Sequence, residues 1–116
     1  MDEQVKYSFD EIRRKFLEMT KSALSLMKQT NSAPDVLSAV LRDVQFVPSE
    51  SGHVDVKINI NSGARHIIVG GMVWPNGAFV PMEPTTVIGG FGSIFDEKID
   101  KVGFLASIFI RAIRQA

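Results

Sequence analysis

The sequence contains no cysteine. This absence excludes disulfide frameworks, thiolate nucleophiles and every metal site with sulfur ligands. The sequence also lacks an excess of either charge, because 13 Lys and Arg residues balance 13 Asp and Glu residues. No overall field therefore draws the chain toward nucleic acid or an anionic membrane, and copies of the chain repel one another little.

A long hydrophobic run is missing as well. The longest apolar or glycine stretch, residues 67–74, is far shorter than the roughly 20 residues that a membrane helix needs. The first residues carry charges of both signs and lack the apolar core of a secretory signal. We therefore expect no membrane association and a cytoplasmic location, or a virion assembled in the cytoplasm.

The composition that is present is typical of one globular domain. The chain has 116 residues, of which 45% are hydrophobic and 22% charged. A chain of this length can bury one core, so we expect a single domain over residues 1–116.

The N-terminal part predicts two helices. Ser8 and Glu11 have the spacing of a capping box, which predicts a helix that begins at Ser8. Its apolar residues recur at spacings of three and four, which indicates one buried face: Phe9, Ile12, Phe16, Met19, Ala23 and Leu26. Pro34 suits the first turn of a second, shorter helix. The apolar stripe of that helix is Val36, Leu37, Val40, Leu41 and Val44, and the helix is expected to end near Asp43, before an extended segment at 45–47.

The middle of the chain changes to the period of a strand. Residues 53–61 alternate between apolar and polar side chains, as in a half-buried antiparallel strand. A turn at 61–63 leads back into a strand at 65–69, and a second turn at 74–77 leads into a strand at 78–80. A last strand is expected at 85–88. Between these elements, Gly70 and Gly71 indicate a bulge or a close approach of the backbone to a neighbour.

The C-terminal part predicts a long helix, capped by Ser93 or Asp96 and running toward Ala116. This helix is apolar nearly all round. One sheet cannot cover all of that surface, so its second side must face the first helix, another subunit or a partner. We expect uncovered apolar surface at Leu105, Ile108 and Ile110.

These elements together predict an α+β fold of the order α-α-β-β-β-β-α. An antiparallel β-meander of about four strands is flanked by N-terminal helices and a long C-terminal helix, and the first and last helices pack on one face. The expected core is Phe9, Ile12, Phe16, Met19, Val40, Val54, Val56, Ile58, Ile60, Ile67, Val69, Val102, Ala106, Phe109 and Ile113.

Two groups of residues are candidates for ligand binding. His53 and His66, with Asp55, would form a metal-binding set if a tight hairpin brought them together. The glycine-rich loop at 89–93 contains Gly90, Gly92 and Ser93, which could bind an anion at a helix N-terminus. The loop lacks both the third glycine of a dinucleotide motif and the Lys-Ser or Lys-Thr of a phosphate loop.

Other features favour structural roles. Trp74, the only tryptophan, could anchor an interface. The basic triplet Arg13, Arg14 and Lys15 is spread over about 200° of a helix, so it forms no single patch for nucleic acid. The sequence has no G-x-S-x-G motif and no carboxylate pair fixed by an apolar surround. We predict no catalytic residue, metal or cofactor.

Three functions remain as hypotheses. The first is a non-enzymatic structural or adaptor protein that acts through homo-oligomerisation or assembly into a larger complex, such as a small phage virion or tail component. Its interface would include Trp74, Leu105, Ile108 and Ile110. The second is a module that binds a small ligand or nucleotide through the 89–93 loop. The third is an inhibitor or immunity-type protein that covers a target protein.

Overall fold

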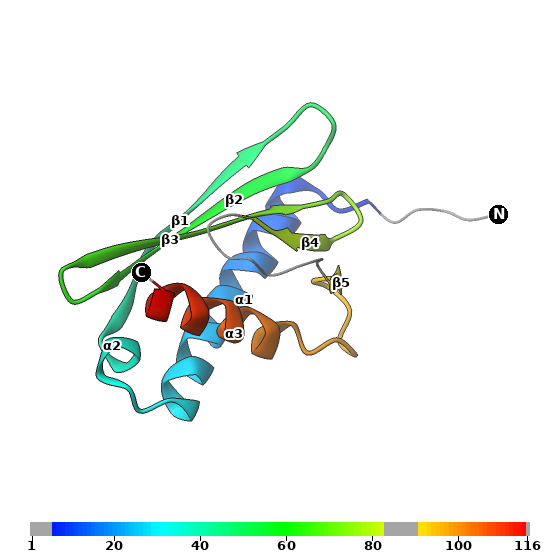
Figure 1. The fold of residues 1–116 in the computed structure, drawn as a ribbon. Coiled ribbons are helices and arrows are strands. Elements are labelled where there is room, and N and C mark those ends of the chain that lie inside the picture. Colours follow the sequence, from blue (N-terminus) through cyan, green and yellow to red (C-terminus); the bar gives the residue numbers. More distant parts are fainter. Residues whose placement is uncertain (1–5, 83–90, 116) are drawn as a thin grey trace.

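The computed structural model describes residues 6–82 and 91–115 and has the predicted α+β architecture. Its helices are α1 (Phe9–Thr30), α2 (Pro34–Leu37) and α3 (Lys101–Gln115), and its strands are β1 (Ala39–Pro48), β2 (Val54–Ser62), β3 (Arg65–Val73), β4 (Ala78–Pro81) and β5 (Phe91–Ser93). The strands form one antiparallel sheet in the order β1-β2-β3-β4-β5. Figure 1 shows α1 and α3 lying on one side of that sheet.

The capping box at the start of α1 is confirmed. The Ser8 hydroxyl accepts a hydrogen bond from the Glu11 N–H at 3.1 Å, and the Glu11 carboxylate accepts one from the Ser8 N–H at 2.8 Å. Both bonds satisfy backbone donors that the first helical turn leaves without a partner. The predicted apolar stripe forms the buried face, and its members Ile12, Phe16 and Ala23 are fully buried.

The second helix is much shorter than predicted. It ends at Leu37, and residues from Ala39 onward form strand β1 instead. The physical reason is pairing, because β1 lies in register with β2 from Ala39 opposite Ser62 to Pro48 opposite Val54. The β-branched residues of this segment suit a strand, and a complete partner strand outweighs its helical periodicity. Val40, predicted to be in the core, is therefore 58% exposed.

The strands β2 and β3 confirm the predicted hairpin. Ser62 pairs with Arg65 across the two-residue turn, and the register runs without a shift to Val54 opposite Val73. The two glycines of β3 make no bulge in this pairing. A close approach of the backbone to a neighbour is confirmed at Gly71, where a Cβ would lie 2.7 Å from the Phe79 Cζ atom.

The sheet differs from the prediction at its far edge. The strand expected at 85–88 lies outside the described residues, and β5 occupies Phe91–Ser93, where a loop was expected. Helix α3 begins at Lys101, and its first turn is capped by Asp100, whose Oδ1 accepts from the Gly103 N–H at 2.9 Å. Capping by Ser93 or Asp96 was therefore wrong. Residues 94–100 form a connection between β5 and α3.

The core lies between the sheet and the two long helices. Phe16 of α1 is at its centre, with its ring 5.1 Å from that of Phe79 in β4 and 6.1 Å from that of Phe46 in β1. Apart from Val40, the predicted core residues are buried or, like Phe9 and Val102, partly buried against the core. The helices thus cover one face of the sheet and leave its other face without a helix among the described elements.

Candidate functional site

The helix-free face of the sheet is the principal candidate site. Along β2, Val54, Val56 and Ile58 are buried toward the helices, whereas Asp55 and Lys57 are exposed on the opposite side. The same alternation runs along β1, β3 and β4, because successive side chains of a strand point to opposite faces. We call the outward side of β1–β4 the open face.

Exposed apolar side chains gather on this open face. Six large hydrophobic side chains among the described residues are more than a third exposed, and five of them have outward positions on the sheet or directly at a strand end: Val40, Val47, Ile68, Trp74 and Met82. The sixth is Leu37 in α2. An apolar concentration on one side of a small protein marks an interaction surface more often than scattered single residues do.

The half of the open face formed by β3 and β4 is the more apolar one. Met72 pairs with Val80, and the Met82 N–H donates a hydrogen bond to the Gly70 carbonyl at 3.0 Å. Ile68 lies two residues before Gly70 on the same side of β3. Gly70 has no side chain and is half-buried between these four apolar residues.

The half formed by β1 and β2 carries a polar network. Asn59 donates from Nδ2 to Asp43 Oδ1 at 2.6 Å, and its Oδ1 accepts from His66 Nε2 at 2.9 Å. A carbonyl oxygen only accepts, so Nε2 of His66 carries a hydrogen. The three side chains join β1, β2 and β3, which leaves Asn59 only 6% exposed although it points outward. Its satisfied hydrogen bonds make this network structural.

A Ser-His-Asp set, which the sequence reasoning missed, lies at the β1–β2 turn. Ser51 Oγ is 2.8 Å and Ser49 Oγ 3.0 Å from the same nitrogen, Nδ1 of His53. Asp55 Oδ1 is 3.9 Å from Nε2, which is too long for a hydrogen bond. Ser49 Oγ also donates to the His53 carbonyl at 2.8 Å, so its proton is directed away from the imidazole. These contacts tie both serines to the imidazole and so close the turn between β1 and β2.

Trp74 extends the open face at this end of the sheet. It is 45% exposed, and its ring centroid lies 5.8 Å from that of His53. Its backbone closes the β3–β4 turn, because the Trp74 N–H donates to the Ala78 carbonyl at 2.8 Å. The predicted anchor residue is therefore exposed and held by a tight turn.

The uncovered surface expected on α3 is absent. Leu105 is 0% and Ile108 1% exposed, and Ile110 is partly buried against the core. The second side of this helix packs on α1, which is the first of the three coverings that the sequence left open. The expectation of exposed apolar surface at Leu105 and Ile108 was wrong. These two residues therefore give no reason to place an interface on α3.

The anion-binding loop does not have the setting that suggested it. Gly90 lies outside the described residues, while Gly92 and Ser93 belong to β5. Ser93 Oγ accepts from the Phe95 N–H at 3.1 Å. Because α3 starts only at Lys101, neither residue is at a helix N-terminus.

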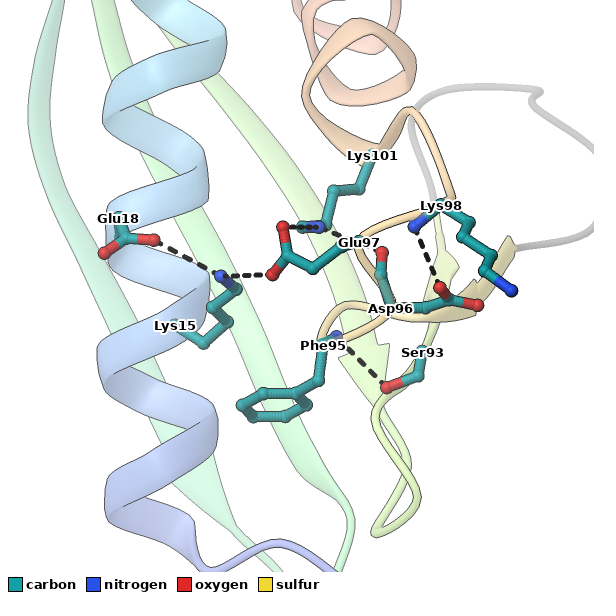
Figure 2. Close-up of polar contacts among 8 residues, drawn as sticks. All are labelled: Lys15, Glu18, Ser93, Phe95, Asp96, Glu97, Lys98 and Lys101. Carbon is teal, nitrogen blue, oxygen red and sulfur yellow. Dashed lines mark hydrogen bonds and ion pairs between the residues drawn. The ribbon is translucent and has the colours of Figure 1, made fainter.

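The connection from β5 to α3 is held by charges instead (Figure 2). Lys101 is nearly buried, and its Nζ donates to the Asp96 carbonyl at 3.0 Å. Glu97 lies between two lysines, with carboxylate oxygens 3.6 Å from Lys15 Nζ and 4.0 Å from Lys101 Nζ. Lys15 also reaches Glu18 at 3.4 Å. This arrangement fastens the connection to α1, so Lys15 is occupied by acidic partners.

The two histidines do not come together. His66 pairs with Asn61 near the β2–β3 turn, while His53 precedes β2 at the other end of the same strand. Within residues 6–82 and 91–115, no group of three His, Asp or Glu side chains could hold a metal ion. In the same part of the chain, none of the helices combines the length and the apolar character needed to cross a membrane.

Comparison with known proteins finds no match to this chain among protein-family models, curated proteins or solved structures.

Proposed function

We propose that this chain is a non-enzymatic structural or adaptor protein that acts by homo-oligomerisation through the open face and adjoining edge of its sheet. The observation that carries the proposal is the position of the exposed apolar side chains. Five of the six found among the described residues lie on one side of the sheet, and none of the described helices covers that side. Covering these residues removes apolar area from water at about 25 cal/mol per Å².

Two further features support association. The formal net charge is zero, so copies approach without long-range repulsion. The open face also lacks a run of charges of one sign, since Asp43 and Asp55 alternate with Lys57 and neutral amides. A structural or adaptor role follows if the assembled oligomer then presents its remaining surface to other components of a larger complex.

Sedimentation velocity over a range of concentrations tests the proposal. The mean mass is expected to rise above the 12.8 kDa of one chain as concentration increases. Ile68→Lys places a charge in the apolar half of the open face and should shift the distribution toward smaller species. Leu37→Lys makes the same change at an exposed apolar residue in α2, outside the open face, and should leave the distribution unchanged. A single 12.8 kDa species at every concentration would refute homo-oligomerisation.

The narrower expectation of a phage virion or tail component stays a prediction, which the neighbouring genes would test. The inhibitor or immunity-type function also stays a prediction, and it needs an identified target. Binding of a nucleotide or other small ligand by the 89–93 loop also stays a prediction. The helix N-terminus that motivated it is not at that loop, because α3 begins at Lys101.

A further inference from the structure

Strand β1 is an edge strand with a sequence that can pair with itself. It has ten residues and pairs with β2 on one side, while no described strand pairs with its other side. A free edge presents backbone donors and acceptors to any strand that matches it. We infer that β1 pairs antiparallel with β1 of a second copy around a two-fold axis at Val44. This inference rests on the proposed function, because it specifies how two copies meet at the adjoining edge of the sheet. The β3–β4 half of the open face is not covered in this pair and remains the surface for contact with a further copy.

The direction of the backbone groups fits this axis. The Ser49 N–H donates to the His53 carbonyl at 3.0 Å where the β1–β2 hairpin begins. Hydrogen-bonded and non-bonded pairs alternate along an antiparallel ladder, so the odd positions from 43 to 47 bond toward β2. Val44 and Phe46 therefore direct their N–H and C=O groups to the free edge.

The bulge in β1 keeps the register consistent beyond this point. Asp43 lies opposite Asn59 and Leu41 opposite Ile60, so Arg42 is the extra residue. Asn59 directs its backbone groups toward β1, so the next residue of β2, Ile60, directs its backbone groups away from β1. Leu41, which lies opposite Ile60, therefore directs its own N–H and C=O groups to the free edge. With the axis at Val44, Phe46 then meets the partner's Leu41, and all the backbone groups of this pair are correctly directed.

The side chains match in the same register. On the open face, Val40 lies opposite the partner's Val47, and each of these residues is 58% exposed in the single chain. On the helix-covered side, Leu41 lies opposite the partner's Phe46. Between them, Asp43 lies opposite the partner's Gln45, whose side-chain amide can donate to the carboxylate.

Neighbouring registers are less favourable. An axis at Asp43 would place two aspartates directly opposite each other, and like charges at such positions oppose pairing. An axis at Gln45 would place Val47 against a carboxylate, that of the partner's Asp43. The Val44 axis is therefore preferred, because apolar residues meet apolar residues on both faces.

A groove lies beside this edge on the helix-covered side of the sheet. It has a volume of about 320 Å³ and is lined by Leu41 together with Lys21, Leu24, Ser25 and Lys28 of α1. In the inferred pairing the partner's Phe46 faces Leu41 on the side of the sheet that α1 covers. Because that ring also packs against Phe16 of its own chain, only its exposed part adjoins the groove, where Leu24 is partly buried by its own chain.

Charged substitutions at positions 40 and 47 test the register. Val40→Glu and Val47→Lys, each alone, place an unpaired charge against valine and should raise the dimer Kd by about tenfold or more. An equimolar mixture of the two variants should form a heterodimer, because one contact becomes Glu opposite Lys and the other stays Val opposite Val. Leu37→Glu, outside the sheet, is the matched control and should dimerise normally. Sedimentation velocity gives the masses, and circular dichroism verifies that each variant is folded.

A cross-linking experiment gives a second measurement in this cysteine-free chain. Val44→Cys should form a disulfide-linked dimer on oxidation, because the two copies of residue 44 lie about 5.5 Å apart across the axis. Gln45→Cys should not, because its two copies lie roughly 8 Å apart, beyond the limit of about 7 Å.

The outcomes separate this inference from the proposed function. Heterodimer rescue together with cross-linking at position 44 alone supports the pairing. If Val40→Glu and Val47→Lys leave the oligomer masses unchanged, the inferred pairing is wrong and the proposed function is unaffected. A wild-type chain that is monomeric at every concentration overturns both.

Discussion

The ring of Phe79 lies directly against the backbone of Gly71, and a Cβ on that glycine would be 2.7 Å from the Phe79 Cζ atom. Both residues are buried. Gly71→Ala therefore forces the ring or strand β3 to move. Overpacking of this kind is expected to lower the free energy of unfolding by about 1–3 kcal/mol, which chemical denaturation measures.

The double variant Gly71→Ala/Phe79→Leu tests whether the ring is the cause. Leucine lacks the ring edge that the new methyl group would meet. The double variant should therefore be more stable than the sum of the two single effects predicts, by about 0.5 kcal/mol or more. Strict additivity of the two effects would show that contact with the Phe79 ring is not the reason why alanine at position 71 destabilises the protein.

The capping box predicts a dependence of stability on pH. The pKa of Glu11 lies below its ordinary value of 4.5. The larger cause is the hydrogen bond from the Ser8 N–H, and the hydrogen bond with the Ser8 hydroxyl is the second. A carboxylate with a lowered pKa stabilises the folded state above the unfolded-state pKa, and the effect is lost as pH falls through the folded-state value. The difference in unfolding free energy between wild type and Glu11→Ala should therefore be constant above about pH 4.5 and shrink below it.

Ser8→Ala is the companion variant for the same cap. It removes the acceptor for the Glu11 N–H and should cost about 1 kcal/mol. A stability difference between wild type and Glu11→Ala that stays unchanged through the acid range would contradict the role of the ionised carboxylate.

Substitutions in α3 and on the sheet should have opposite consequences. Leu105→Ala empties a fully buried position and is expected to cost about 2–5 kcal/mol of stability without changing the oligomer distribution. Ile68→Ala should cost much less stability and weaken association. Thermal melts and sedimentation of the two variants measure both properties. If folded Leu105→Ala lost the ability to associate, α3 would have to be part of the interface, against this account.

The sequence predicted the elements with strong local signals. The capping box located the start of α1, and the strict alternation of residues 53–61 located β2 and its buried face. The turn at Trp74 was predicted because Pro75 suits its first central position and Gly77 accepts a positive φ, and Gly77 indeed has a φ of 93°. In these segments local preference and tertiary packing agree.

The errors arose where long-range pairing decided the outcome. Val40 follows a helical period in the sequence, but pairing with β2 makes it part of a strand. Leu105 and Ile108 were expected to need a partner, because the width of α1 as a cover for α3 cannot be read from either segment alone. The gathering of apolar residues on the open face was missed for the same reason, since these residues come from β1, β3 and the ends of β3 and β4.

Hydroxyl-radical labelling of the purified protein, read by mass spectrometry, tests most directly whether the open face is covered in the oligomer. Trp74 and Met82 are reactive side chains on that face, Leu37 is equally exposed elsewhere, and Met19 and Met27 are buried controls. Raising the protein concentration should reduce labelling of Trp74 and Met82 and leave that of Leu37 unchanged. Equal labelling of Trp74 and Met82 at low and high concentration would contradict assembly through the open face.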